Sequence, residues 1–320
     1  MTDTNTAQVG MTSMEVEFLN KLRASMEELT DKKTSLKALL YGESGVGKTV
    51  LAMQMAQVIT PPDRRIIFID SYQGWATLNN HPALKQRAAR LSISGISQFE
   101  ALATGIKMKA QGFADIGTVV IDEHSPFGEL DTLAVTKARA MTDPTKDPEQ
   151  PMLPDMQISS NRMKQFTAPL VRLEDVNLIL VAHMREDKDN VGVLKISPAY
   201  LPKLSKHLRN LMMLIGYVEA ELREDPATGS VEYIRTVQVM PTRKVVAKTR
   251  VGGFNGVYVT PRDLVYGVKE WLDGSRDTVE VDKIHAEEPV PQTEEIETDE
   301  ITNDDKLTEI TDTLNNDLLS

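Results

Sequence analysis

The sequence predicts an α/β fold in which a mainly parallel sheet is flanked by helices and followed by a C-terminal antiparallel extension. Continuous apolar runs separated by helix-length segments are typical of parallel strands that are buried on both faces. After these runs, the alternating segments 212–222 and 231–240 flank the turn sequence EDPATGS. This pattern predicts an antiparallel hairpin that follows the parallel core.

The parallel part is predicted from elements that follow one another along the chain. We expect strands at 36–41, 66–69, 90–93, 118–121 and 176–182, and helices at 49–59 and 98–110. A further amphipathic helix is expected at 13–28, because apolar residues recur there about four positions apart: Met14, Phe18, Leu22 and Met26. Ligands of open parallel sheets bind beyond the carboxyl ends of the strands, so the side chains that follow these strands are expected to converge.

The 320 residues divide into three expected parts: an N-terminal segment at 1–34, a folded core at 35–272 and an acidic tail at 273–320. Residues 274–320 hold 15 acidic and 3 basic side chains, a balance of −12, whereas the whole chain carries −11. The core is therefore nearly neutral, and the composition of the tail is typical of a disordered segment. Near-helical apolar spacing at the end of the tail fits a solvated tail, a partner-docking peptide or an internal mimic of nucleic acid: Leu307, Ile310, Leu314 and Leu318.

Composition also limits the chemistry and the compartment. The chain has no cysteine, which excludes disulfides and cysteine-bound metals, and its five histidines show no metal-ligand spacing. No apolar run reaches the roughly 20 residues that span a bilayer, and no signal-peptide core is found near the N-terminus. We therefore expect a cytoplasmic protein.

The sharpest signal is the sequence GESGVGKT, which fits the phosphate-loop pattern G-x-x-x-x-G-K-[ST], also called Walker A. Its eight residues are expected to bind a nucleoside triphosphate: Gly42, Glu43, Ser44, Gly45, Val46, Gly47, Lys48 and Thr49. Glycines let successive N–H groups point at phosphate oxygens, and the following helix offers its positive N-terminal end to the same anion. The Lys48 ammonium can reach the β- and γ-phosphates, and the Thr49 hydroxyl can bind Mg²⁺.

Acidic side chains and a histidine follow other expected strands. Asp122 follows 118–121, where a nucleotide hydrolase places its second Mg²⁺-organising group. Glu123 is the first candidate to orient the attacking water and Asp70 is the second, with a solvated strand-end acid as the alternative for Glu123. His183 is expected either to sense the γ-phosphate or to end its strand as an ordinary structural histidine.

Two short stretches are rich in basic residues. The first lies in TRKVVAKTRVGG and contains Arg243, Lys244, Lys248 and Arg250, and the second contains Lys203, Lys206 and Arg209. Such groups can bind nucleic-acid phosphates, bind the nucleotide or solvate an edge strand, and all three alternatives stay open.

Residues 36–250 resemble the RecA-like P-loop ATPases, in particular short phage-encoded members linked to single-strand annealing and recombination. The resemblance rests, in chain order, on YGESGVGKT, IIFIDSYQG, TVVIDEHS, LILVAH, the hairpin and AKTRVGG. It implies ATP and Mg²⁺ as ligands, DNA-stimulated ATP hydrolysis, binding of single-stranded DNA, and assembly of identical subunits into a ring or filament. By the same resemblance, Lys248 and Arg250 would act in trans at the site of a neighbouring subunit.

One position departs from the pattern of this family. Relatives often have a catalytic Glu two residues after the strand-end Asp, where this chain has Tyr72. Either Glu123 has taken that role, or the nucleotide acts mainly as a switch. The family also places DNA-binding loops at positions that correspond here to about 141–158 and 184–200, with Tyr200 as the only aromatic residue nearby.

Together these features predict an ATP-hydrolysing protein that acts on single-stranded DNA in recombination, annealing or replication of a phage genome. The acidic tail would modulate access to DNA or recruit a replication or recombination protein. A phage motor or packaging accessory, and a nucleotide-gated binding module with negligible turnover, are the alternatives. Salt-dependent binding to single strands would favour the first interpretation.

Overall fold

The structure is a computed structural model of the chain, and it describes residues 13–24, 35–70, 74–143, 145–188, 191–224, 229, 231–254 and 256–275. Helix α1 (Ser13–Ala24) covers the first part of the helix expected at 13–28. Tyr72 and the acidic tail beyond Ser275 lie outside the described residues. Among the helices that the structure describes, none is long and apolar enough to cross a membrane.

The described strands form a mainly parallel sheet with an antiparallel extension, which confirms the predicted fold class. The strands are β1 (Lys37–Gly42), β2 (Arg65–Asp70), β3 (Ala88–Leu91), β4 (Ile116–Asp122), β5 (Asn177–Lys188), β6 (Leu194–Pro198), β7 (Leu214–Glu224), β8 (Val231–Gln238), β9 (Lys248–Thr249) and β10 (Tyr258–Val259). The sheet order is β10-β8-β7-β1-β5-β4-β2-β3, with β6 beside β5 and β9 beside β7. All neighbours from β7 to β3 in this order are parallel, whereas β7 and β8 form the expected antiparallel hairpin.

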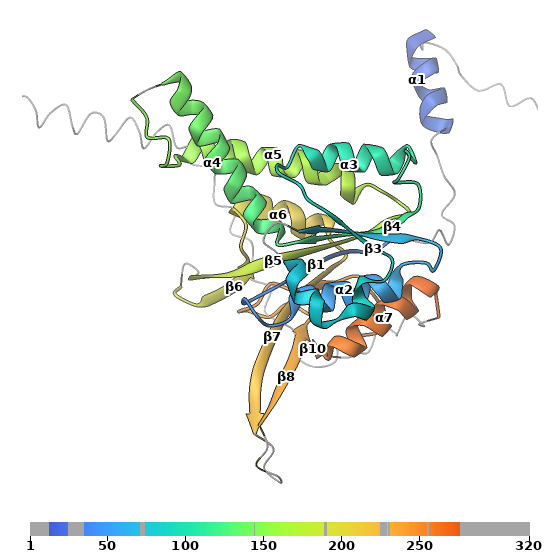
Figure 1. Ribbon diagram of the computed structural model, residues 1–320. Helices are drawn as coiled ribbons and strands as arrows, with labels where there is room; N and C mark the ends of the chain where they lie inside the picture. Colours follow the sequence, from blue (N-terminus) through green and yellow to red (C-terminus); the bar gives the residue numbers. More distant parts are fainter. Residues whose placement is uncertain are drawn as a thin grey trace, which may run out of the picture. The chain divides into compact units, whose positions relative to one another are not determined.

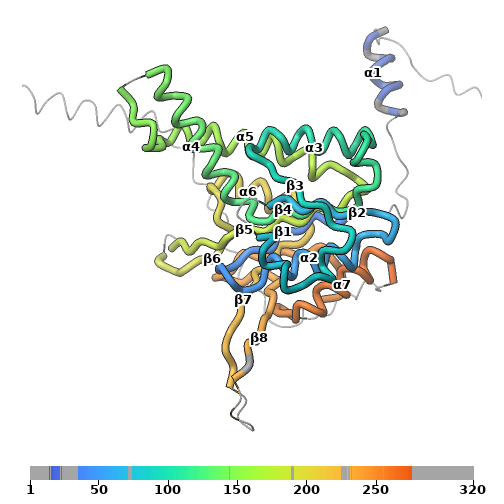
Figure 2. Tube along the Cα trace, viewed as in Figure 1, coloured from blue at the N-terminus to red at the C-terminus, as the bar shows by residue number. Residues whose placement is uncertain are grey.

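Helices cover both faces of this sheet (Figure 1). They are α2 (Lys48–Ile59), α3 (Gln98–Lys107), α4 (His124–Thr142), α5 (Leu153–Val171), α6 (Pro202–Leu211) and α7 (Pro261–Asp273), with short 3₁₀ helices η1 (Gly74–Asn80) and η2 (Pro82–Lys85). Helices α3, α4, α5 and α6 lie on one face, and α2 and α7 lie on the other. Figure 2 shows α2 and α7 side by side, although they are far apart in the sequence.

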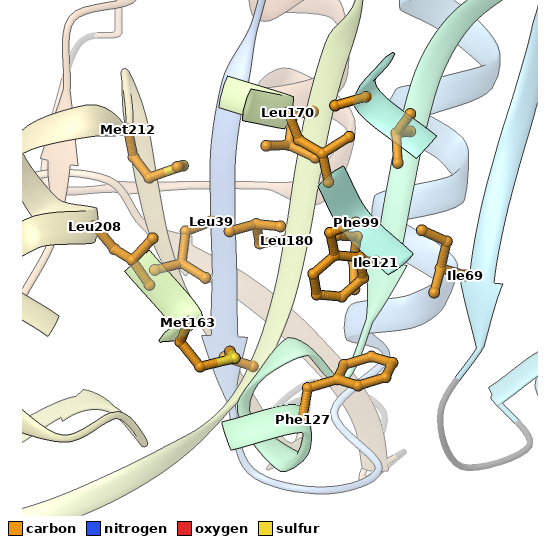
Figure 3. Packing of buried hydrophobic residues seen from close by; sticks show 14 of the residues in the cluster. Leu39, Ile69, Phe99, Ile121, Phe127, Met163, Leu170, Leu180, Leu208 and Met212 are labelled. Carbon is orange, nitrogen blue, oxygen red and sulfur yellow. The ribbon is translucent and has the colours of Figure 1, made fainter. Parts of the chain in front are cut away.

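The alternation of side chains between the two faces explains the continuous apolar runs. Alternate strand residues point toward α3, α4, α5 and α6 and pack with Phe99, Phe127 and Met163, as Figure 3 shows: Leu39, Ile69, Ile121 and Leu180. The residues between them pack against α2 and α7 in a second cluster: Leu40, Phe68, Val120 and Val181. Because both faces are buried, every position of these strands favours an apolar side chain, and each large one contributes roughly 1.5–3 kcal/mol.

Strand β5 is longer than predicted, and the prediction of an irregular loop over 184–200 is wrong. The strand continues past His183 to Lys188 and forms an antiparallel hairpin with β6, in which Met184 lies opposite Pro198. Side-chain exposure increases along β5 from His183 onward, so backbone pairing rather than apolar burial holds this part. The region 141–158 is likewise more regular than expected, because α4 runs to Thr142 and α5 begins at Leu153.

Candidate active site

The phosphate-loop residues, 42–49, connect the end of β1 to the start of α2. Gly45 and Gly47 have φ values of 82° and 93°, in the left-handed region that favours glycine, and α2 begins directly afterwards. A side chain at Gly42 would place its Cβ 2.1 Å from the carbonyl oxygen of Val218 on β7, so this position also requires glycine. The loop can therefore turn its backbone N–H groups and the N-terminus of α2 toward one anion.

Lys48 supplies a buried cation to this loop. The side chain bends back over the loop, where Nζ donates to the carbonyl oxygens of Gly42, at 3.1 Å, and Glu43. Burial lowers the pKa of Lys48, and the carboxylates of Glu123, Asp122 and Glu43 oppose that shift. A phosphate group bound by the loop could replace the two carbonyl oxygens as the partner of this ammonium.

Thr49 and Asp122 come together although they are far apart in the sequence. The Thr49 hydroxyl lies 3.0 Å and 3.1 Å from the two carboxylate oxygens of Asp122 at the end of β4. Burial raises the pKa of Asp122 to about 7, with further contributions from Glu123 and Asp70, while the Thr49 hydrogen bond opposes the shift. A hydroxyl and a carboxylate are the hard oxygen ligands that Mg²⁺ prefers, so this pair fits a magnesium ion.

The pair would need further ligands from the nucleotide. Within the part of the chain that the structure describes, no three His, Asp or Glu side chains form a group that could hold a metal ion. Magnesium in nucleotide enzymes is typically held by one or two carboxylates together with the phosphates of the substrate. The site is thus suited to a metal–nucleotide complex rather than to a free ion.

Glu123 and His183 lie next to this pair and contact each other. The Glu123 backbone is left-handed, with φ of 57°, at the position where β4 turns into α4. Its Oε1 lies 3.3 Å from Nε2 of His183, whose own backbone N–H donates to the Ser125 hydroxyl. A left-handed conformation of a residue other than glycine is costly and recurs at functional sites, which is consistent with Glu123 being aimed at a reacting group.

Asp70 contacts two other segments of the chain. It lies beside Asp122 on the neighbouring strand, and its side chain is buried. One carboxylate oxygen is 2.9 Å from Nη2 of Arg90, and the other accepts the backbone N–H of Gly74 at 2.8 Å. These contacts favour a role for Asp70 in positioning the segment that begins at Gly74.

Gly74 is a site residue that the sequence did not indicate. A Cβ atom at this position would lie 1.8 Å from Oδ2 of Asp122, far closer than any real contact. The first turn of η1 therefore packs directly on the carboxylate that faces Thr49. Only glycine allows this approach.

Tyr200 and His124 form part of the core. His124 is fully buried, and its ring nitrogens pair with the hydroxyls of Tyr200, at 2.9 Å, and Thr167, at 3.2 Å. Burial lowers the pKa of His124 to about 3, so this ring is neutral in the folded protein. Tyr200, which the sequence singled out as the aromatic nearest to the expected DNA-binding loops, is only 4% exposed and therefore is not a surface for stacking bases.

The two basic stretches meet in a groove between α6 and the segment 241–248. This basic groove has a volume of about 650 Å³, and its cationic lining comes from Lys195, Lys206, Arg209, Arg243 and Lys248. No acidic side chain lines it among the residues that the structure describes. The Lys248 ammonium donates to the backbone carbonyls of Arg209 and Asn210 at the end of α6, whereas Arg250 is exposed to solvent.

Comparison with known families is consistent with this geometry. Residues 34–251, more than half of the chain, match the family model described as AAA domain. The chain belongs to the AAA-domain family. This AAA-domain protein therefore has an α/β fold of the P-loop type with the properties of a nucleotide-binding ATPase, a family that generally binds ATP with Mg²⁺. No curated protein sequence matches it.

Proposed function

We propose that this AAA-domain protein is a DNA-stimulated ATPase that acts on single-stranded DNA in recombination, annealing or replication of a phage genome. It works as a homo-oligomer in the host cytoplasm, and its acidic tail contacts a replication or recombination protein. The observation that carries the ATPase assignment is the convergence of Lys48, the Thr49–Asp122 pair and the Glu123–His183 pair at one edge of the sheet.

The residues at this edge of the sheet have separate roles in hydrolysis. Loop N–H groups and the Lys48 ammonium bind and orient the phosphates, which is the main contribution of protein to phosphoryl transfer. Thr49 and Asp122 hold Mg²⁺, which neutralises charge on the phosphates when it is bound. The Glu123 carboxylate accepts the proton of the attacking water, and His183, 3.3 Å away, keeps that carboxylate in place.

The basic groove supports DNA as the polymer. Five cationic side chains from α6, β6 and the segment 241–248 line one continuous depression, and this arrangement suits a phosphate backbone. A platform for stacking bases is not built into it, because its lining lacks aromatic side chains among the residues described. Binding through the cationic lining should depend strongly on salt.

Binding to fluorescently labelled oligonucleotides at several salt concentrations tests the DNA assignment. Lys206→Glu should weaken binding to single strands about tenfold or more and reduce the salt dependence, because one phosphate contact becomes a repulsion. Lys107→Glu, an exposed lysine at the end of α3 outside the groove, is the matched control and should bind as the wild type does. Equal losses in both variants would contradict the assignment of the groove. Preference for duplex DNA would point instead to a motor or packaging accessory.

A further inference from the structure

The left-handed backbone of Glu123 depends on the residues that follow it. With φ of 57° and ψ of 61°, Glu123 forms the turn between the end of β4 and the first turn of α4. A residue other than glycine keeps such a conformation only where the surrounding structure fixes it. The next two residues, His124 and Ser125, are both buried, so their contacts can supply this restraint.

The ring of His124 is held at both of its nitrogen atoms. Nδ1 lies 2.9 Å from the hydroxyl of Tyr200, which precedes α6, and Nε2 lies 3.2 Å from the Thr167 hydroxyl of α5. A neutral imidazole has one donor and one acceptor nitrogen, and a hydroxyl can serve either of them. The rings of Phe99 and Tyr200 pack against the imidazole, with centroid distances of 5.9 Å and 5.6 Å. The ring therefore cannot turn without breaking one of these contacts.

A second restraint acts through Ser125. Its hydroxyl accepts the backbone N–H of His183 at 3.2 Å, and the His183 ring in turn contacts the Glu123 carboxylate. Ser125 and His183 thus connect Glu123 to β5, whereas His124 connects it to α5 and to the segment before α6. Glu123 is fixed from both of these parts of the fold.

We propose that Tyr200 and Thr167 are positioning residues for ATP hydrolysis: their hydroxyls fix the ring of His124, and this ring holds the Glu123 backbone in the conformation that aims its carboxylate. The proposal rests on the proposed function, in which Glu123 accepts the proton of the attacking water. Tyr200, Thr167 and His124 are buried in the core, so they act through Glu123 and not on the nucleotide itself. Packing alone would be satisfied by apolar side chains at these positions.

Two conservative substitutions test this role in steady-state ATP hydrolysis. Tyr200→Phe and Thr167→Val each remove one hydroxyl and keep most of the side-chain volume. Because a misplacement of about 1 Å costs roughly 100-fold in rate, we expect the smaller shift caused by one lost hydroxyl to lower kcat about tenfold. KM for ATP should stay within about twofold, since the phosphate loop and Lys48 are unchanged. Thr167→Ser keeps the hydroxyl and should retain the kcat of the wild type.

Thr118→Val is the matched control, because it also removes a fully buried threonine hydroxyl. That hydroxyl lies 2.6 Å from the Thr60 hydroxyl and accepts from the Asn177 amide at 3.2 Å, near the start of β4 and away from Asp122 at its end. The control should lose stability to urea as Thr167→Val does, but its kcat should match the wild type. Equal decreases of kcat in the two valine variants would overturn the proposal.

A double-mutant cycle shows whether the tyrosine acts through the glutamate. In single-turnover assays, adding Tyr200→Phe to Glu123→Gln should cause no further loss of rate, because the group that it positions is already absent. A further tenfold loss in the double variant would overturn the proposal.

The backbone of Glu123 gives a readout that does not depend on turnover. The NMR chemical shifts of its backbone carbons depend on φ and ψ, and they should move in Tyr200→Phe and Thr167→Val but not in Thr118→Val. Unchanged shifts in both of the first two variants would overturn the proposal. If the wild type does not hydrolyse ATP, the proposed function fails, and these shifts still decide whether the two hydroxyls hold Glu123.

Discussion

Gly74→Ala is expected to disable hydrolysis without removing nucleotide binding. The added Cβ would lie 1.8 Å from Oδ2 of Asp122, about 1.2 Å inside the 3.0 Å limit below which real Cβ atoms essentially never approach another atom. Asp122 is buried and held by Thr49, so its carboxylate must move by about 1 Å or η1 must shift away. Either change disturbs a pair of oxygen ligands that Mg²⁺ requires at about 2.0–2.1 Å.

The size of the effect follows from this displacement. A misplacement of about 1 Å in a catalytic constellation costs on the order of 100-fold in rate, so we expect kcat for ATP hydrolysis to fall by about that factor. ATP binding in the absence of Mg²⁺ should change little, because the loop and Lys48 do not contact Gly74 through any described hydrogen bond. The assay is steady-state hydrolysis over a Mg²⁺ titration, paired with ATP binding in chelator.

Gly95→Ala is the matched control for this substitution. Gly95 has no heavy atom within 4 Å of an added Cβ, so this variant should hydrolyse ATP as the wild type does. Wild-type kcat and Mg²⁺ dependence in Gly74→Ala would refute the reasoning, because they would mean that the Asp122 carboxylate does not need its present position.

Three further changes test other parts of the account. Glu123→Gln should keep ATP bound but lower turnover at least 100-fold in single-turnover assays, since an amide cannot accept the proton of the attacking water; normal hydrolysis would remove Glu123 from that role. Arg250→Ala should lower turnover of the assembled protein while ATP binding persists, and unchanged turnover across protein concentrations would argue against a trans-acting arginine. Burial lowers the pKa of His124 to about 3 in the folded protein, whereas the unfolded chain has a pKa of about 6.5. The unfolded state therefore binds a proton first as the pH falls, so the contribution of His124 to the free energy of unfolding is fully present above pH 6.5 and is lost as the pH falls toward 3. Urea unfolding at pH 7 and pH 5 should show a loss of up to about 2 kcal/mol that His124→Asn lacks, and equal losses in both proteins would exclude this histidine as the cause.

Much of the fold could be predicted because its strands are buried on both faces. Continuous apolar runs such as 66–69 and 119–121 arise when each residue packs against one helical layer or the other. Ile121 lies in the cluster with α3 to α6, for example, whereas Val120 lies in the cluster with α2 and α7. The close approach of Thr49 to Asp122 follows from the same rule, because the carboxyl ends of parallel strands lie at one edge of the sheet.

The parts that could not be predicted depend on contacts between distant segments. The second half of β5 has no apolar run, because it is held by pairing with β6, and so its sequence is typical of a loop. Gly74 ends the segment IIFIDSYQG, but its need for glycine arises only from the position of Asp122 on another strand. Arg235 is a cation in an alternating strand, which usually indicates a solvent-facing position, whereas here the loop lies beside it.

The most direct test of the central claim is steady-state ATP hydrolysis by the purified full-length protein, with and without single-stranded DNA, alongside Lys48→Ala and Lys206→Glu. The account predicts turnover that single strands stimulate, no turnover in Lys48→Ala, and loss of stimulation but not of basal turnover in Lys206→Glu. Tight ATP binding without turnover in either condition would contradict it. In that case the protein would be a nucleotide-gated binding module, and the edge that brings Asp122 and Glu123 together would act as a switch.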